Sequence, residues 1–296
     1  MILAVVFALA AAMANAVNLL TQHKASIGAP RRVKGWRLAL YLPRQPLWLL
    51  GVAAAVGSFI FQALALHNGP MSVVQPLLVT ELVFVLVLRR IWIRQDVARA
   101  AWASVTVVCV TLAVFLAVGE PTGGHPFPAA KQWLSAGLVF GGVITVLTLL
   151  GLRGSPARRA AVLAAATGLT ASLEASFLKT ATQTLSVSGI GGMLTDWPVY
   201  AFIAATITGA LLQQAALHVG PLSVSQPLLV IVDPFASIIL SVWLFGEHFT
   251  DSPAKIAIAV AAFAVMAAGV VMLTRTAPQD LTPSQPARPA SPEPAS

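Results

Sequence analysis

Long apolar runs separated by short polar segments make up most of the chain. A run of about 18 or more apolar residues is long enough to cross the hydrocarbon core of a bilayer as a helix. Nine such runs are present, at 2–21, 47–67, 71–88, 101–118, 133–152, 160–180, 197–218, 222–244 and 254–274. Tryptophans such as Trp48, Trp133 and Trp197 stand at the starts of runs, as expected of rings at headgroup level. The pattern predicts nine transmembrane helices.

The composition excludes a water-soluble protein. Of the 296 residues, 57% are hydrophobic and 9% are charged, against about 25% charged in an ordinary soluble domain. The net charge is +8, but the basic residues lie in loops between apolar runs. They do not gather on a water-exposed face, so binding of nucleic acid is not expected. We expect an all-α polytopic protein of the cell (plasma) membrane, with the lipid bilayer as its partner.

The basic residues also predict an orientation. If the nine runs cross the membrane in turn, fifteen of the eighteen lysines and arginines fall on one side. Only Lys131, Lys179 and Lys255 fall on the other. Because basic loops stay in the cytoplasm, the N-terminus is predicted outside the cell and the C-terminus inside.

The two ends of the chain need separate interpretations. Residues 1–16 could be a signal peptide, but no basic residue precedes the apolar stretch. Asn15, Asn18 and Gln22 have the spacing of one helix face, which favours a helix retained in the bundle. The segment 275–296 contains six prolines among small polar residues and is predicted to be a disordered cytoplasmic tail.

An internal repeat is the most informative feature of the sequence. HNGPMSVVQPLLV (67–79) matches HVGPLSVSQPLLV (218–230) at ten of thirteen positions. Gln62 and Gln213 stand at the same offset of 151 residues. The two halves of the chain therefore look like duplicates.

The number of runs between the two copies predicts their relative orientation. The copies are five runs apart, and an odd separation inverts one copy across the bilayer. We therefore predict nine helices in a 4+1+4 inverted-repeat arrangement, which is a recurrent plan of secondary transporters. The predicted units are a first four-helix repeat (1–118), a connecting helix (119–152), a second, inverted repeat (153–274) and the tail (275–296).

The segment PLLVIVDPFASIILSVWLFGEHFT (227–250) resembles the EamA-type signature of the drug/metabolite transporter superfamily. The resemblance rests on a helix that begins at a proline and ends in a Gly-Glu-x-x-Thr turn, here Gly246, Glu247 and Thr250. The 4+1+4 layout is similar to that of the NIPA-like branch, and this similarity implies magnesium transport. In the first copy, Arg94-Gln95-Asp96 stands where the second has Phe245-Gly246-Glu247.

Three of the ten acidic residues fall inside apolar runs: Glu81, Glu174 and Asp233. A charge at this depth is costly, so it usually faces the bundle interior and serves an ion, a proton or a substrate. The alternative is that each carboxyl is protonated, or is paired with a neighbour such as Lys179, and only holds helices together. Asp233 is the strongest candidate because Pro234 removes a backbone hydrogen bond beside it.

Further polar residues accompany these acids. The candidates for binding substrate or proton are Asp233, Glu81, Glu174, Gln226, Gln75, Gln62, Gln213, Asn15 and Asn18. Asp233 and Glu81 are tentative metal ligands, because hard divalent cations prefer oxygen. Gln226 shares a predicted helix face with Asp233, Ser237 and Ser241. The candidates for gating or helix-end roles are His67, His218, Pro76, Pro227 and Pro234, for which a structural role is the simpler interpretation.

The motifs of enzymes and of ATP-driven pumps are missing from the sequence. No enzyme activity and no cofactor is expected, so transport would be driven by gradients. The sequence favours a secondary transporter that moves a cation, such as Mg²⁺, or a small metabolite by alternating access. The alternative is a non-transporting membrane scaffold or partner subunit. Nothing in the sequence predicts an oligomeric state.

Overall fold

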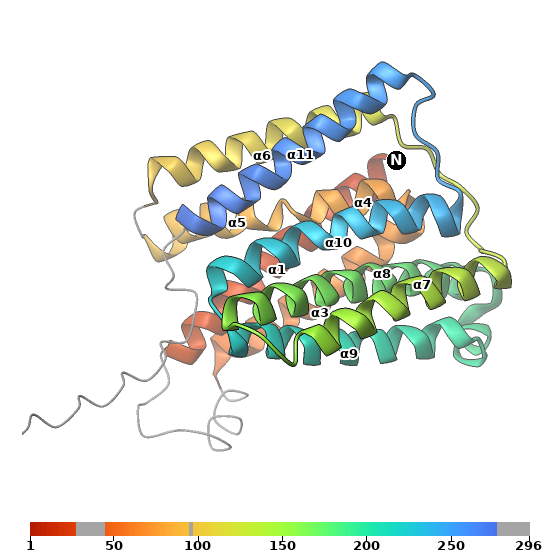
Figure 1. Cartoon of the computed structure of the whole chain (residues 1–296), viewed down its shortest axis with the longest axis horizontal. Helices are drawn as coiled ribbons and strands as arrows, with labels where there is room; N and C mark the ends of the chain where they lie inside the picture. The colour runs from red at the N-terminus through yellow and green to blue at the C-terminus, as the bar shows by residue number, and fades with distance from the viewer. Residues whose placement is uncertain (28–44, 95–96, 277–296) are drawn as a thin grey trace, which may run out of the picture.

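The computed structural model describes residues 1–27, 45–94 and 97–276, and in these ranges it is a bundle of helices with one isolated β-bridge. Figure 1 shows the bundle. The helices are α1 (Ile2–Ile27), α3 (Pro46–Asn68), α4 (Met71–Leu78), α5 (Glu81–Leu88), η2 (Arg89–Ile93), α6 (Arg99–Gly119), α7 (Ala130–Leu150), α8 (Pro156–Thr195), α9 (Trp197–Val219), α10 (Leu222–Phe245) and α11 (Pro253–Thr276). The predicted tail after Thr276 and most of the first basic loop lie outside these ranges.

Nine spans in the described ranges are long and apolar enough to cross a membrane, which confirms the prediction of a multi-pass helical protein. The elements α4, α5 and η2 together form one of these spans. Large apolar side chains such as Leu138, Val187 and Leu211 are exposed, as a lipid-facing surface requires.

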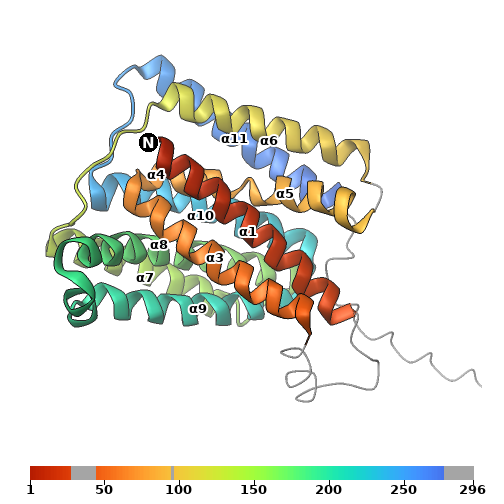
Figure 2. The same cartoon turned by 180° about the vertical axis from the view of Figure 1, so that it is seen from behind.

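The helices lie roughly along a common axis and alternate in direction (Figures 1 and 2). Met1 and Thr276 therefore lie at opposite ends of the bundle. We name the two ends after these residues. The Met1 end contains the α3–α4 turn and the connections that follow α6 and α10, and the Thr276 end contains the α7–α8 and α9–α10 connections.

The core lies where α4, α8 and α10 meet. Met71, Leu77, Leu178, Leu240 and Phe245 belong to one buried cluster there. Around it, α1 packs mainly against α3, and α8 packs against both α9 and α10. The pair of α6 and α11 forms a separate layer beside this group (Figure 1).

Two helices differ from their predicted form. The run predicted at 160–180 continues to Thr195, beyond the apolar stretch, and Gly189 changes the chain direction there with φ +68°. The run predicted at 71–88 is interrupted at Val79–Thr80. There the Thr80 hydroxyl donates to the carbonyl of Leu77 (2.6 Å), and backbone bonds three residues apart replace the α-helical ones. A hydroxyl that bonds the preceding turn competes with the regular helix in this way.

The paired Gly-Pro turns reverse the chain between helices and pack closely against a neighbouring helix. Gly69 lies so close to Ala4 of α1 that a Cβ would overlap it. Gly220 lies equally close to Pro156 and Ala160 at the start of α8. These glycines are required for space, because both have an extended backbone that any residue adopts.

We expect Gly220→Ala to lower the stability of the purified protein by about 1–3 kcal/mol, because the added methyl group forces α9 and α10 away from α8. The measurement is thermal unfolding in detergent. Gly141→Ala in α7 is the control, since nothing lies within 4 Å of its added Cβ. Equal melting temperatures for the two variants would contradict the close approach.

Candidate functional site

Glu81 is the first residue of α5 and lies just after the interruption of its span. Its carboxylate Oε2 accepts a hydrogen bond from Asn15 Nδ2 of α1 at 2.7 Å. Asn15 Oδ1 accepts from Asn18 (3.3 Å), and Asn18 Oδ1 accepts from Gln22 (2.6 Å). The predicted polar face of the first helix is thus a hydrogen-bonded ladder from Glu81 toward the Thr276 end.

Asp233 and Glu174 form a second acidic group, in α10 and α8. Asp233 Oδ1 accepts from Ser237 Oγ at 3.1 Å, and Glu174 Oε1 accepts from Thr206 Oγ1 of α9 at 2.9 Å. The two carboxyl groups lie close enough to act on each other electrostatically. Near Asp233, α8 and α10 approach closely, because a Cβ at Gly168 would meet Val232 and the backbone nitrogen of Asp233.

The three acids therefore form two groups. The hydrogen bond of Glu81 goes to α1, whereas those of Asp233 and Glu174 stay within α8, α9 and α10. Among the described residues, no group of three or more His, Cys, Asp or Glu side chains could hold a metal ion. The pairing of Asp233 with Glu81 at a metal stays a prediction.

The glutamine candidates lie in different surroundings. Gln75 is 2% exposed, and its Nε2 donor has no partner in the described ranges. Gln62 is half-buried, whereas Gln213 and Gln226 are exposed. Gln226 thus does not join the buried face on which Ser237 and Ser241 lie.

The candidates for helix-end roles also differ in burial and in their place along the helices. His67 is half-buried at the end of α3, and its carbonyl accepts a hydrogen bond from Gln183 of α8 at 2.9 Å. His218 is exposed at the end of α9. Three buried prolines lie inside helices: Pro76, Pro227 and Pro234. The helix α10 continues through its two prolines, so the chain stays helical at Asp233.

The sequence interpretation missed a buried ion pair. It counted Glu247 among the loop acids, but Glu247 is fully buried. Its Oε1 accepts from Lys179 Nζ of α8 (2.8 Å) and from the amide of Met71 (2.7 Å). Its Oε2 accepts from the amide and the hydroxyl of Ser72, at 2.9 and 2.6 Å. The carboxylate thus caps the N-terminus of α4, where the helix dipole favours a negative charge.

The local chain conformation directs Glu247 into this position. Gly246 ends α10 in the left-handed region, with φ +61°, and glycine adopts that conformation without strain. The ammonium of Lys179 also donates to the carbonyl of Gly69 (3.0 Å) and lies 4.9 Å from the centre of the Phe245 ring. One signal could have revealed the pair, because Lys179 is a lysine inside a predicted apolar run.

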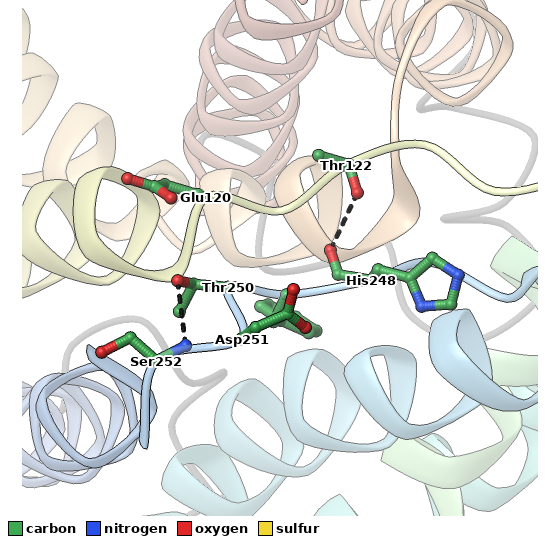
Figure 3. A pocket seen from close by; sticks show the side chains of 7 residues that line it. Glu120, Thr122, His248, Thr250, Asp251 and Ser252 are labelled. Atoms are coloured by element: carbon green, nitrogen blue, oxygen red, sulfur yellow. Dashed lines mark hydrogen bonds between the residues drawn. The ribbon is translucent and has the colours of Figure 1, made fainter. Parts of the chain in front are cut away.

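A surface pocket lies at the Met1 end, and its lining includes His248, the residue after Glu247 (Figure 3). Glu120 and Thr122 line it from the segment after α6, and His248, Thr250 and Asp251 line it from the connection between α10 and α11. The Thr122 hydroxyl donates to the carbonyl of His248 (3.2 Å), and the two segments also form a short antiparallel bridge. The two acidic side chains of the pocket, Glu120 and Asp251, are exposed, and Glu120 forms an ion pair with Lys255 at 2.6 Å.

The helices and their apolar surface define the chain as a multi-pass membrane protein. It is similar to an uncharacterized protein of Corynebacterium glutamicum, with 28% identity over 277 residues that cover 93% of this chain and 96% of that protein. No family model matches the chain, and no solved structure matches it.

We expect Lys179→Met to destabilise the protein by about 3–5 kcal/mol, because the buried Glu247 carboxylate would lose its compensating charge. Lys255→Met removes an ion pair at the same end whose partners are both well exposed, so it should change stability by less than about 1 kcal/mol. Thermal unfolding of the two purified variants measures the difference. A similar small effect of both would show that Glu247 is not a charged group in the folded protein.

Proposed function

We propose that the protein is a secondary transporter that carries a cation or a small metabolite by alternating access, with Asp233 and Glu174 binding the cation or the coupling proton. The observation that carries the proposal is the set of partners of the three membrane acids. Each carboxyl hydrogen-bonds to a neutral side chain, and the three donors are Asn15, Thr206 and Ser237. In the described ranges, none of the three acids forms an ion pair with a lysine or arginine.

The hydrogen-bond partners matter because a carboxylate inside a membrane has lost its hydration and needs a nearby positive charge or several donors to stabilise it. A charged carboxylate that only joins helices would be stabilised by an ammonium or guanidinium group. Here the buried lysine, Lys179, is bonded to Glu247 instead. Asp233 and Glu174 also lie near each other, and like charges favour the uptake of a proton or a cation. This arrangement suits a site that is loaded and emptied during a cycle.

The packing of the helices supports an inverted repeat as part of this proposal. The contact of α1 with α3 corresponds to that of α8 with α9, and α1 meets α4 and α5 as α8 meets α10. The turns agree as well, because Gly69 packs against the start of α1 and Gly220 against the start of α8. The remaining equivalent helices, α6 and α11, pack against each other.

The cargo is proposed only as a class. Oxygen ligands suit hard cations such as Mg²⁺, which the resemblance to the NIPA-like branch of the drug/metabolite transporter superfamily also implies. Two acids with hydroxyl neighbours equally suit an organic cation exchanged for protons. The panel for a transport assay therefore contains Mg²⁺, monovalent cations and small organic cations, each tested with and without a proton gradient.

Asp233→Asn should reduce transport in proteoliposomes by more than about tenfold, because an amide neither titrates nor carries the charge that binds a cation. Folding should be largely kept, since the amide has nearly the same shape and is cheaper to bury. Glu174→Gln and Glu81→Gln are the comparisons and should have weaker effects. Normal transport by an Asp233→Asn protein that melts much earlier would favour the scaffold alternative.

The proposal also includes the predicted orientation in the plasma membrane, with the Met1 end outside and the Thr276 end in the cytoplasm. Basic residues at the Thr276 end, including Arg90, Arg153 and Arg158, are the reason. A C-terminal alkaline phosphatase fusion should be inactive, and a C-terminal fluorescent reporter that matures only in the cytoplasm should be bright. The reverse pattern would overturn the orientation.

A further inference from the structure

The Lys179–Glu247 pair joins segments from both halves of the chain at one end of the bundle. Glu247 bonds to the start of α4, and Lys179 bonds from α8 to Glu247 and to the α3–α4 turn. Lys179 is 6% exposed and Glu247 is 0% exposed, so the pair is almost wholly shielded from solvent. The Met1 end is closed at this point.

A second set of bonds holds the same end. The amide of His125 donates to the carbonyl of Phe245 (2.8 Å), and the amide of Thr250 donates to the carbonyl of Gly119 (3.0 Å). These bonds tie the segment after α6 to the segment that carries Glu247. Movement of the Glu247 segment would thus move the ends of α6, α10 and α11 together.

A line of polar side chains leads from Asp233 to the ion pair. Ser237 and Ser241 follow Asp233 at intervals of four residues, which places the three on one face of α10. Both serines are fully buried, and the carbonyl of Ser241 accepts from the amide of Glu247 at 3.1 Å. On α8, the buried Ser176 lies one turn before Lys179. The ion pair is therefore at the outer limit of a polar strip that starts at Asp233.

We propose that Lys179 and Glu247 form the gate that closes the Met1 end of the pathway to Asp233. This inference rests on the proposed transport function. It adds that the ion pair must break and form again in each transport cycle. In the open state the two charges separate and water reaches Ser176, Ser241 and then Asp233.

The energetics of a buried ion pair suit a gate. Removing both charges from water costs free energy that their mutual attraction largely offsets. Closure by such a pair is therefore nearly balanced against opening, whereas burial of a large apolar contact favours closure strongly. The pair also closes in one geometry only, because four donors surround the carboxylate in fixed directions.

The test measures access of water to the polar strip and needs no substrate. The background variant is Cys109→Ala, which removes the single native thiol, and Ser176→Cys supplies a buried probe. Lysed membranes expose both faces to a water-soluble maleimide. The gate variant combines Lys179→Met with Glu247→Gln, so that no lone buried charge remains. The control combines Lys255→Met with Glu120→Gln, which removes the exposed pair at the same end.

We expect the gate variant to raise the labelling rate at position 176 at least tenfold, and the control to leave it unchanged. Glu247→Gln alone leaves the buried ammonium of Lys179 without its counter-charge and should also raise the rate. An unchanged rate in the gate variant overturns the proposal.

A second cysteine probe distinguishes opening of the Met1 end from loosening of the whole helix bundle. Ser225→Cys places a thiol at a fully buried position of α10 near the Thr276 end. Its labelling rate should not rise in the gate variant. Equal increases at positions 176 and 225 would mean that the whole bundle loosens, and this outcome also overturns the gate. Because labelling is independent of transport, a failure of the gate is distinguishable from a failure of the function proposed for Asp233.

Discussion

The ion pair of Lys179 and Glu247 determines how the two halves of the chain meet. It fixes the start of α4, because the carboxylate takes both free amides there, and it holds α8 against the same turn. The position of α4 in turn places the interruption at Thr80 and the start of α5 at Glu81. Glu81 in the first half is therefore positioned by contacts from the second half.

Charge compensation divides the buried acids into two kinds. Glu247 has a cation and three further donors, so its charge is satisfied by the protein itself. Glu81, Glu174 and Asp233 have neutral donors, which leave a carboxylate short of stabilisation in an apolar surrounding. A helix that only needed cohesion would gain more from a second serine or an apolar residue. Because of this difference in partners, we propose Glu247 for closing the pathway, and Asp233 and Glu174 for binding.

The sequence predicted the spans because a bilayer demands about 20 apolar residues per helix, and this requirement is local to each run. The polar face of α1 was also predictable, since Asn15, Asn18 and Gln22 share it by spacing alone. Burial of Glu247 was not predictable, because it depends on the start of α4, 175 residues away in the sequence. The exposure of Gln226 was not predictable for a related reason. Its spacing places it on the same face of α10 as Asp233, but the neighbouring helices determine which part of that face is buried.

The two repeat copies differ where their acids stand. Thr80 and Glu81 in the first copy align with Ile231 and Val232 in the second. The Thr80 hydroxyl bonds the preceding turn and the helix breaks there, although both copies carry a proline four residues earlier, whereas α10 continues unbroken. The break places Glu81 at the start of α5, where its carboxylate bonds to Asn15 of α1. Asp233 lies within a continuous helix and bonds to Ser237 of the same helix. The duplicated segments thus hold their acids in unequal surroundings, and this difference is the reason why we propose Asp233, and not Glu81, for the group that gains and loses its charge.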